Sequence, residues 1–290
     1  MTGQWVPWHE AHSIEAVGVS VAFSESVNET LWRRMLRTAE EVAPAAGLTN
    51  VVSPSALHIS FGGPNPVARN EEHRNLVHFQ RIAVDIDGGN QALGNIAEEL
   101  IVGRDSIQYI SYQYSRWVPF LQQMTLFFGE LLGKALVGVR PQNVRIEYRD
   151  RFVFDGEKSE ALPSDLLRES SAYIASHAFS RKDLWHSHTG FFCDASGADR
   201  RLIQIMIDVA DLLIADEAKR SIGILTVVQD NLGVGFLSEE VVDDPSAASQ
   251  LVVSRFQELH DAAHSLFAQI VNDQTASRVG MDVGRRSSHA

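Results

Sequence analysis

The sequence predicts an α+β fold, a largely antiparallel β-sheet covered on one side by three or more helices, including a long C-terminal helix. Segments with alternating apolar residues occur in both halves of the chain, which is typical of antiparallel strands. Three other segments repeat apolar residues at helical spacing. Strands and helices are mixed along the chain, and this ordering favours helices packed on a sheet.

The N-terminal part predicts a strand followed by a helix. Residues 14–23, IEAVGVSVAF, are rich in valine and small residues and predict a strand. Ser26 and Glu29 fit a capping box, and apolar residues then recur at helical spacing until Pro44. Residues 44–78 are rich in proline and glycine, so we expect a long irregular connection with one short strand around 57–61.

The middle of the chain predicts further strands around a second helix. Strands are expected from Phe79, in FQRIAVDIDGG, and in SIQYISYQYS, where Ile110, Tyr112 and Tyr114 share one face. The apolar stripe and the early proline of residues 118–136 predict a helix.

Residues 144–154, VRIEYRDRFVF, form the clearest alternating strand. The apolar residues of this strand point one way, and Asp150 lies on their side. The other face carries Arg145, Glu147, Arg149 and Arg151.

The C-terminal half predicts a short helix near 165–173, strands in LWHSHTGFF, RRLIQIMIDV and SIGILTVVQ, and a long helix that opens at Asp244 and Pro245. The last strand is apolar on both faces, as in a central strand. We expect residues 1–13 to be an N-terminal extension, 14–279 a single α+β domain, and 280–290 a disordered tail.

Composition excludes several classes of protein. The formal net charge of −12 repels a phosphate backbone, so nucleic-acid binding is not expected. The single cysteine, Cys193, fits a reducing cytoplasm, and no signal peptide or membrane span is expected from the sequence. Glycine-rich phosphate loops and the G-x-S-x-G motif do not occur.

Three stretches carry a family resemblance: YSRWVPF at 114–120, VRIEYRDRF at 144–152 and RFQELHDAAHSLFAQIV at 255–271. With them the chain resembles a sporadically distributed, profile-defined family of uncharacterised prokaryotic proteins of about this length. The resemblance covers residues 14–279 and implies a single α+β domain of unknown activity. Asp150 replaces an asparagine usual in that family. The scattered occurrence of such proteins implies a mobile or defence-linked gene context.

A second resemblance concerns His186 and His188, which project from the same face of a strand. Together with Ser196 and Asp199 they are similar to the motif of the JAMM metallopeptidases, zinc enzymes that cleave isopeptide bonds to ubiquitin-like proteins. In that interpretation His186, His188 and Asp199 bind zinc, Glu130 activates the water and Ser196 supports the oxyanion.

The surrounding sequence favours the opposite interpretation, in which the two histidines lie on a half-buried strand face. Thr189 replaces a proline usual after the second histidine. RRLIQIMIDV after Asp199 alternates like a strand where the JAMM fold has a helix, and Glu130 falls within a predicted helix.

The remaining candidates have structural alternatives. Arg145, Arg149 and Arg151 are candidates for contact with an anionic partner, or else a solvated sheet face interleaved with Glu147. His260 and His264 could share a metal at i, i+4 spacing or lie at the edge of the core. We expect Cys193 to be inert, and Asp150 either to reach water or to pair with an arginine.

We therefore expect a cytoplasmic member of that profile-defined family that acts by protein–protein interaction, without a cofactor. A zinc-dependent, JAMM-like isopeptidase or hydrolase is the alternative. The identity of the partner and the oligomeric state stay open.

Overall fold

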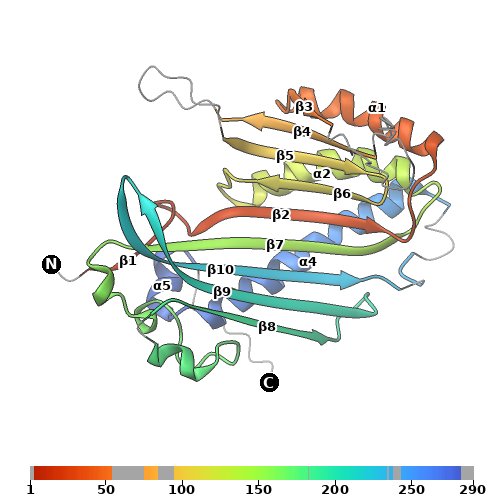
Figure 1. Ribbon diagram of the computed structural model, residues 1–290. Helices are drawn as coiled ribbons and strands as arrows, with labels where there is room; N and C mark the ends of the chain where they lie inside the picture. The colour runs from red at the N-terminus through yellow and green to blue at the C-terminus, as the bar shows by residue number, and fades with distance from the viewer. Residues whose placement is uncertain are drawn as a thin grey trace, which may run out of the picture. The chain divides into compact units, whose positions relative to one another are not determined.

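The computed structural model describes residues 3–53, 75–83, 95–181, 183–233, 235–237 and 243–281. The chain is mixed helix and strand, with antiparallel strand pairing and four α-helices in the described part, the longest being the C-terminal α4 (Pro245–Ile270) (Figure 1). The contacts divide it into two compact units. Unit 1 contains residues 1–19, 143–236 and 254–290, and unit 2 contains residues 20–142 and 237–253.

Unit 1 is built on the antiparallel strand order β7-β10-β9-β8. The strands are β7 (Pro141–Phe154), β10 (Glu217–Asn231), β9 (Arg200–Ile214) and β8 (Trp185–Cys193). Strand β1 (Trp5–Pro7) pairs with the C-terminal end of β7. The same unit includes the first six residues of β2 (Ile14–Phe23).

Apolar side chains gather on one face of this sheet. Its inward residues are apolar and buried on three successive strands: Val144, Ile146, Tyr148 and Phe152 on β7, Ile222, Ile224 and Val228 on β10, and Ile203, Ile205, Ile207 and Val209 on β9. The C-terminal part of α4 packs on this face, where Phe267 stacks on Phe152 with ring centroids 6.5 Å apart. A short helix, α5 (Asp273–Arg278), follows.

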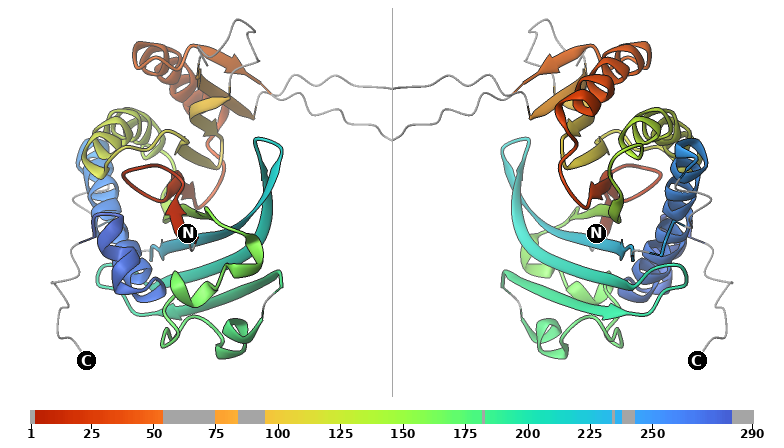
Figure 2. Two further views of the ribbon diagram at one scale, coloured as in Figure 1. Left: turned by 90° about the vertical axis from the view of Figure 1, so that its left-hand side faces the viewer. Right: turned by 90° about the vertical axis from the view of Figure 1, so that its right-hand side faces the viewer.

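Strands β9 and β10 are much longer than their neighbour β8 and form a long, curved hairpin, teal to cyan in Figure 2. Ala215 and Asp216 make the turn at its tip, and both have positive φ angles. Because β8 pairs only with residues 201–209 of β9, the last residues of the hairpin extend past it.

Unit 2 has the antiparallel strand order β3-β4-β5-β6. The strands are β3 (Asn50–Val52), β4 (Leu76–Ile82), β5 (Ile96–Gly103) and β6 (Ser106–Ser111). Helices α1 (Glu29–Ala45) and α2 (Trp117–Ala135) belong to the same unit. Tyr109 of β6 stacks on Phe120 of α2, so the aromatic side chains of this strand and helix share one core.

Most of the predicted elements are confirmed, and the differences have local causes. Asn28, not Ser26, caps α1 and accepts a hydrogen bond of 3.0 Å from the Leu31 amide. Strand β6 ends at Ser111, so Tyr112 and Tyr114 lie beyond it and do not share its face with Ile110, and the buried residues of the strand include Ile107 and Tyr109. The helix expected near 165–173 is wrong: the structure has a 3-10 turn at Pro163–Asp165 and irregular chain after it.

Other expectations lie partly or wholly outside the described residues. These are the short strand at 57–61, most of the irregular connection at 44–78 and the tail beyond 281. In the described part of the chain, no helix is both long and apolar enough to cross a membrane.

Candidate binding edge and its polar anchor

Strand β8 is the terminal strand of unit 1. It is nine residues long, WHSHTGFFC, and within the described residues it pairs with β9 alone. It contains no proline and no Lys, Arg, Asp or Glu. Its register with β9 is unbroken from Trp185 to Cys193, so it has no bulge. A terminal strand of this length therefore presents a straight row of backbone donors and acceptors to an additional strand.

Side chains on β8 alternate between two environments. His186, His188, Gly190 and Phe192 are exposed on the face away from α4, and Phe192 is 51 % exposed. The alternate residues face the helix side, where Tyr173 stacks on Phe191 and its carbonyl accepts a 3.0 Å hydrogen bond from the Thr189 hydroxyl. The histidines were expected on a half-buried face, but they lie on the open one.

The structure does not bring Asp199 to the two histidines. In the β8–β9 hairpin Cys193 lies opposite Arg201, so Asp199 is beyond the end of β8. His188 is five residues before Cys193, which places it about seven positions from Asp199 along the strands, or on the order of 20 Å. The chain after Asp199 is strand β9, as its alternation predicted.

The other residues of the zinc interpretation are held elsewhere. The Ser196 carbonyl accepts a hydrogen bond from Arg255, and Glu130 is exposed on helix α2 of unit 2. Among the described residues, no group of three or more His, Cys, Asp or Glu side chains is arranged to hold a metal ion. The residues of this motif therefore do not fit a zinc ion.

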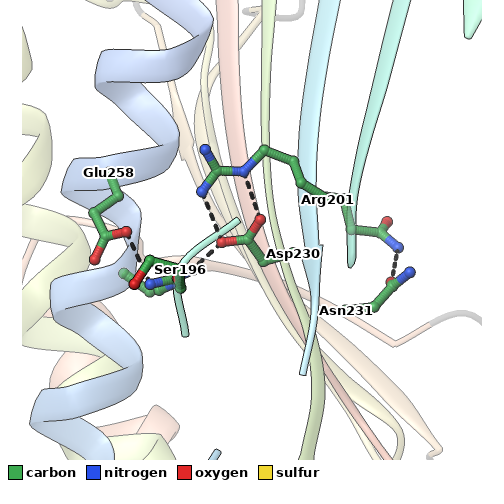
Figure 3. A network of polar contacts seen from close by, with 7 residues as sticks. Ser196, Arg201, Asp230, Asn231 and Glu258 are labelled. Carbon is green, nitrogen blue, oxygen red and sulfur yellow. Dashed lines mark hydrogen bonds and ion pairs between the residues drawn. The ribbon is translucent and has the colours of Figure 1, made fainter. Parts of the chain in front are cut away.

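A buried ion-pair network lies at the end of the hairpin that carries β8 (Figure 3). Asp230, the penultimate residue of β10, has a completely buried side chain. Its carboxylate accepts hydrogen bonds of 2.6 and 2.9 Å from Arg201 and one of 2.8 Å from Arg255 of α4. Arg255 also binds Glu258 at 2.8 Å.

This network fixes the loop between β8 and β9. Arg255 reaches the Ser196 carbonyl in the loop, and Arg201 is the residue opposite Cys193. Gly197 has a positive φ of 70°, and a Cβ atom there would lie 3.0 Å from the Arg255 guanidinium. Hydrogen bonding to Asp230 raises the pKa of Arg201, because the carboxylate stabilises its charged form. The loop, β10 and α4 are thus tied together at one point.

The arginine row on β7 is already paired on the same open face. Arg145 binds Glu147 at 2.8 Å, Arg149 lies 4.0 Å from the same carboxylate, and Arg151 binds Glu15 at 3.0 Å. The described contacts thus match the interpretation of this row as a solvated sheet face in which Glu147 lies among the arginines. Whether an anionic partner also binds there stays a prediction.

Two titratable groups lie under the sheet on the α4 side. Asp150 is buried and accepts a 2.7 Å hydrogen bond from Ser13, and burial raises its pKa to about 7. Asp150 was expected to reach water or to pair with an arginine; among the described residues it does neither, because it is buried and its hydrogen-bond partner is Ser13. His260 lies 2.8 Å from the Tyr148 hydroxyl, and burial together with the nearby His264 lowers its pKa to about 4.

Sequence reasoning missed the Asp230 network and the position of β8 at the edge. A signal for the first was present: Asp230 ends an apolar strand, and Arg255 falls within the buried stripe of α4. Buried charges need partners, so these two could have been matched. No comparable signal marks β8 as terminal, because strand order is a property of the whole sheet.

Comparison of the chain with protein-family models, with curated proteins and with solved structures finds no match in any of the three. The two family resemblances therefore stay predictions.

Proposed function

We propose that this protein acts by binding protein, and that it takes an extended segment of its partner as an additional strand on the β8 edge. One observation carries the proposal: β8 is a terminal strand of nine residues without charge, proline or bulge. Strand addition obtains affinity from backbone hydrogen bonds and specificity from alternate side chains.

The absence of edge protection in β8 is the physical basis of the proposal. Edge strands that must stay unpaired usually carry lysine, proline or a bulge, since these prevent pairing with another chain. In unit 2, by comparison, the terminal strand β3 is only three residues long. A long edge strand without such protection is best explained if it pairs with a strand of a partner when the protein functions.

The anchoring of the edge supports the same proposal. The Asp230 network holds the β8–β9 loop, and Tyr173 contacts the covered face of β8. An edge that is held in place loses less conformational entropy when a partner strand binds. The exposed residues His186, His188 and Phe192 would then contact alternate side chains of the partner.

The proposal includes the setting and architecture inferred from the sequence. We place the activity in the cytoplasm of a prokaryote, within the sporadic family and the mobile or defence-linked context that the resemblance implies. We also propose that helices cover one face of the sheet and that the other face, with the arginine row, borders the bound segment.

The test is capture of partners from native host extract with an edge-blocked variant. His188→Lys with Gly190→Lys places two charges on exposed positions of β8, and a Cβ at Gly190 makes only ordinary contacts of 3.6 Å or more. We expect this variant to fold normally and to lose every protein, including untagged copies of itself, that the wild type retains.

The matched control places the same charges one strand away from the edge. Gln204 and Met206 of β9 lie opposite Gly190 and His188, on the same face. Gln204→Lys with Met206→Lys should retain the captured proteins. Loss of capture in the control but not in the edge variant would contradict binding at the β8 edge.

A further inference from the structure

We infer that the strand added to β8 is β8 of a second copy of this chain, in a two-fold antiparallel pair. This inference rests on the proposed function and names its partner. Three features of the described structure support it: the self-complementary sequence of β8, its lack of charge, and its place as the last strand of the order, with alternate side chains exposed.

The sequence of β8 pairs well with itself. Full overlap of two nine-residue strands places Thr189 on the two-fold axis, opposite its copy. Ser187 then lies opposite Phe191, Trp185 opposite Cys193, and His188 opposite Gly190. Each large side chain thus faces a smaller one, and the remaining pair, His186 and Phe192, joins two rings. Cross-strand pairs of this kind stabilise antiparallel sheets.

Other registers are less favourable. A paired strand keeps its side chains on the same face only if the shift is an even number of residues. Moving the axis to His188 puts Phe191 against Trp185 and leaves Phe192 unpaired. Moving it to Gly190 leaves Trp185 and His186 unpaired. The fully overlapped register alone uses all nine residues.

Charge favours the same edge for self-association. The chain has a net charge of −12, so two copies repel each other over most orientations. Strand β8 carries no Lys, Arg, Asp or Glu, and this makes it a place where two copies approach with little local repulsion. A single pair of nine-residue strands is a small interface, so we expect a dimer that dissociates in the micromolar range, at Kd on the order of 1–100 μM.

A cysteine pair tests the register directly. In a Cys193→Ser background, His188→Cys with Gly190→Cys brings the new thiol at position 188 opposite the new thiol at position 190 of the other copy, at a separation typical of disulfides. Either single variant places the two copies of its cysteine diagonally, where the Cα atoms are about 7–8 Å apart. We expect a covalent dimer on mild oxidation of the double variant, and at least a tenfold lower yield from either single variant.

The mass in solution provides the second measurement. Light scattering of the wild-type chain should show a mass that rises towards that of a dimer with concentration. The variant with His188→Lys and Gly190→Lys should stay monomeric, because the lysine at position 188 would face the lysine at position 190 of the other copy. A wild-type monomer at several hundred micromolar, or equal cross-linking by the single variants, overturns the inference. If that monomer still captures other proteins in an edge-dependent way, the proposed function stands without it.

Discussion

At the scale of single residues, the carboxylates of Asp150 and Asp230 are buried under opposite conditions. Asp230 has two guanidinium partners, whereas Asp150 has one hydroxyl donor. Burial without a charged partner favours the protonated form of Asp150. The two residues therefore make different predictions for stability.

Replacement of Asp230 should be strongly destabilising. Asp230→Asn leaves the guanidinium groups of Arg201 and Arg255 without their carboxylate, which typically costs about 3–5 kcal/mol. Glu258→Gln changes the exposed member of the same network and should cost less than about 1 kcal/mol. Urea denaturation of both variants checks this, and equal losses would show that the buried pairs have no special role.

Asp150 should make the protein less stable as pH rises. Its folded pKa of about 7 exceeds the ordinary value of 3.8, so the folded state holds the proton more tightly. The resulting stability is complete below pH 4 and is lost as pH rises through 7. This loss in the free energy of unfolding amounts to up to about a few kcal/mol between pH 5 and 8. Asp150→Asn should remove it.

The measurement is the free energy of unfolding of wild type and Asp150→Asn at pH 5 and pH 8. Asp208→Asn, which changes an exposed carboxylate on β9, should keep the wild-type difference. His260 acts in the opposite direction: its pKa is lowered from 6.5 to about 4, so its contribution is present above pH 6.5 and is lost as pH falls. An Asp150→Asn variant with the same difference between pH 5 and pH 8 as the wild type would contradict a protonated Asp150.

At the scale of elements, the β9–β10 hairpin has a turn that its sequence does not favour. Ala215 and Asp216 have φ angles of 48° and 66°, a region that Asn and Gly adopt with less strain. Ala215→Asn with Asp216→Gly should raise the free energy of unfolding by about 1 kcal/mol.

The control for the turn is Ala218→Gly, within strand β10. It should lower the same free energy, because glycine loses more entropy in an extended strand. Thermal unfolding of both variants is sufficient. Stabilisation by the strand glycine, or destabilisation by the turn pair, would show that the backbone conformation at 215–216 is not strained.

The individual strands and helices differ in how well the sequence predicted them. Alternation predicted β7 and β9 with their buried faces, because a residue's side of a strand follows from its parity. The helix expected at 165–173 is wrong because this segment forms turns beside the end of α4, where Leu167 pairs with Val271, the residue after the helix. The periodicity of a segment indicates which of its faces is buried. It does not indicate which other element packs on that face.

For the candidate site, too, the sequence predicted some features and not others. The position of His186 and His188 on one face followed from their spacing, and the strand after Asp199 followed from its alternation. Two properties did not follow: that β8 is terminal, and that Asp230 joins Arg201 to Arg255. Both depend on contacts between segments far apart in the chain, which no local pattern encodes.

At the scale of the whole molecule, net charge and the uncharged edge act together. Two copies of a chain with net charge −12 repel each other, and salt screens this repulsion. Self-association through β8 should therefore strengthen as salt rises from about 0.05 to 0.5 M, in contrast to an interface of ion pairs. Sedimentation velocity at the two salt concentrations measures this, and dissociation at high salt would indicate that charged residues form the contact.

Backbone hydrogen exchange of β8 tests the central claim, pairing at this edge, most directly. The alternate amides of residues 185–193 that do not bond to β9 should exchange slowly at high protein concentration and fast at low concentration. In the variant with His188→Lys and Gly190→Lys they should exchange fast at every concentration, while the β9–β10 amides stay protected. Fast exchange of these β8 amides in the wild type, at high concentration and with captured partner present, would contradict the account.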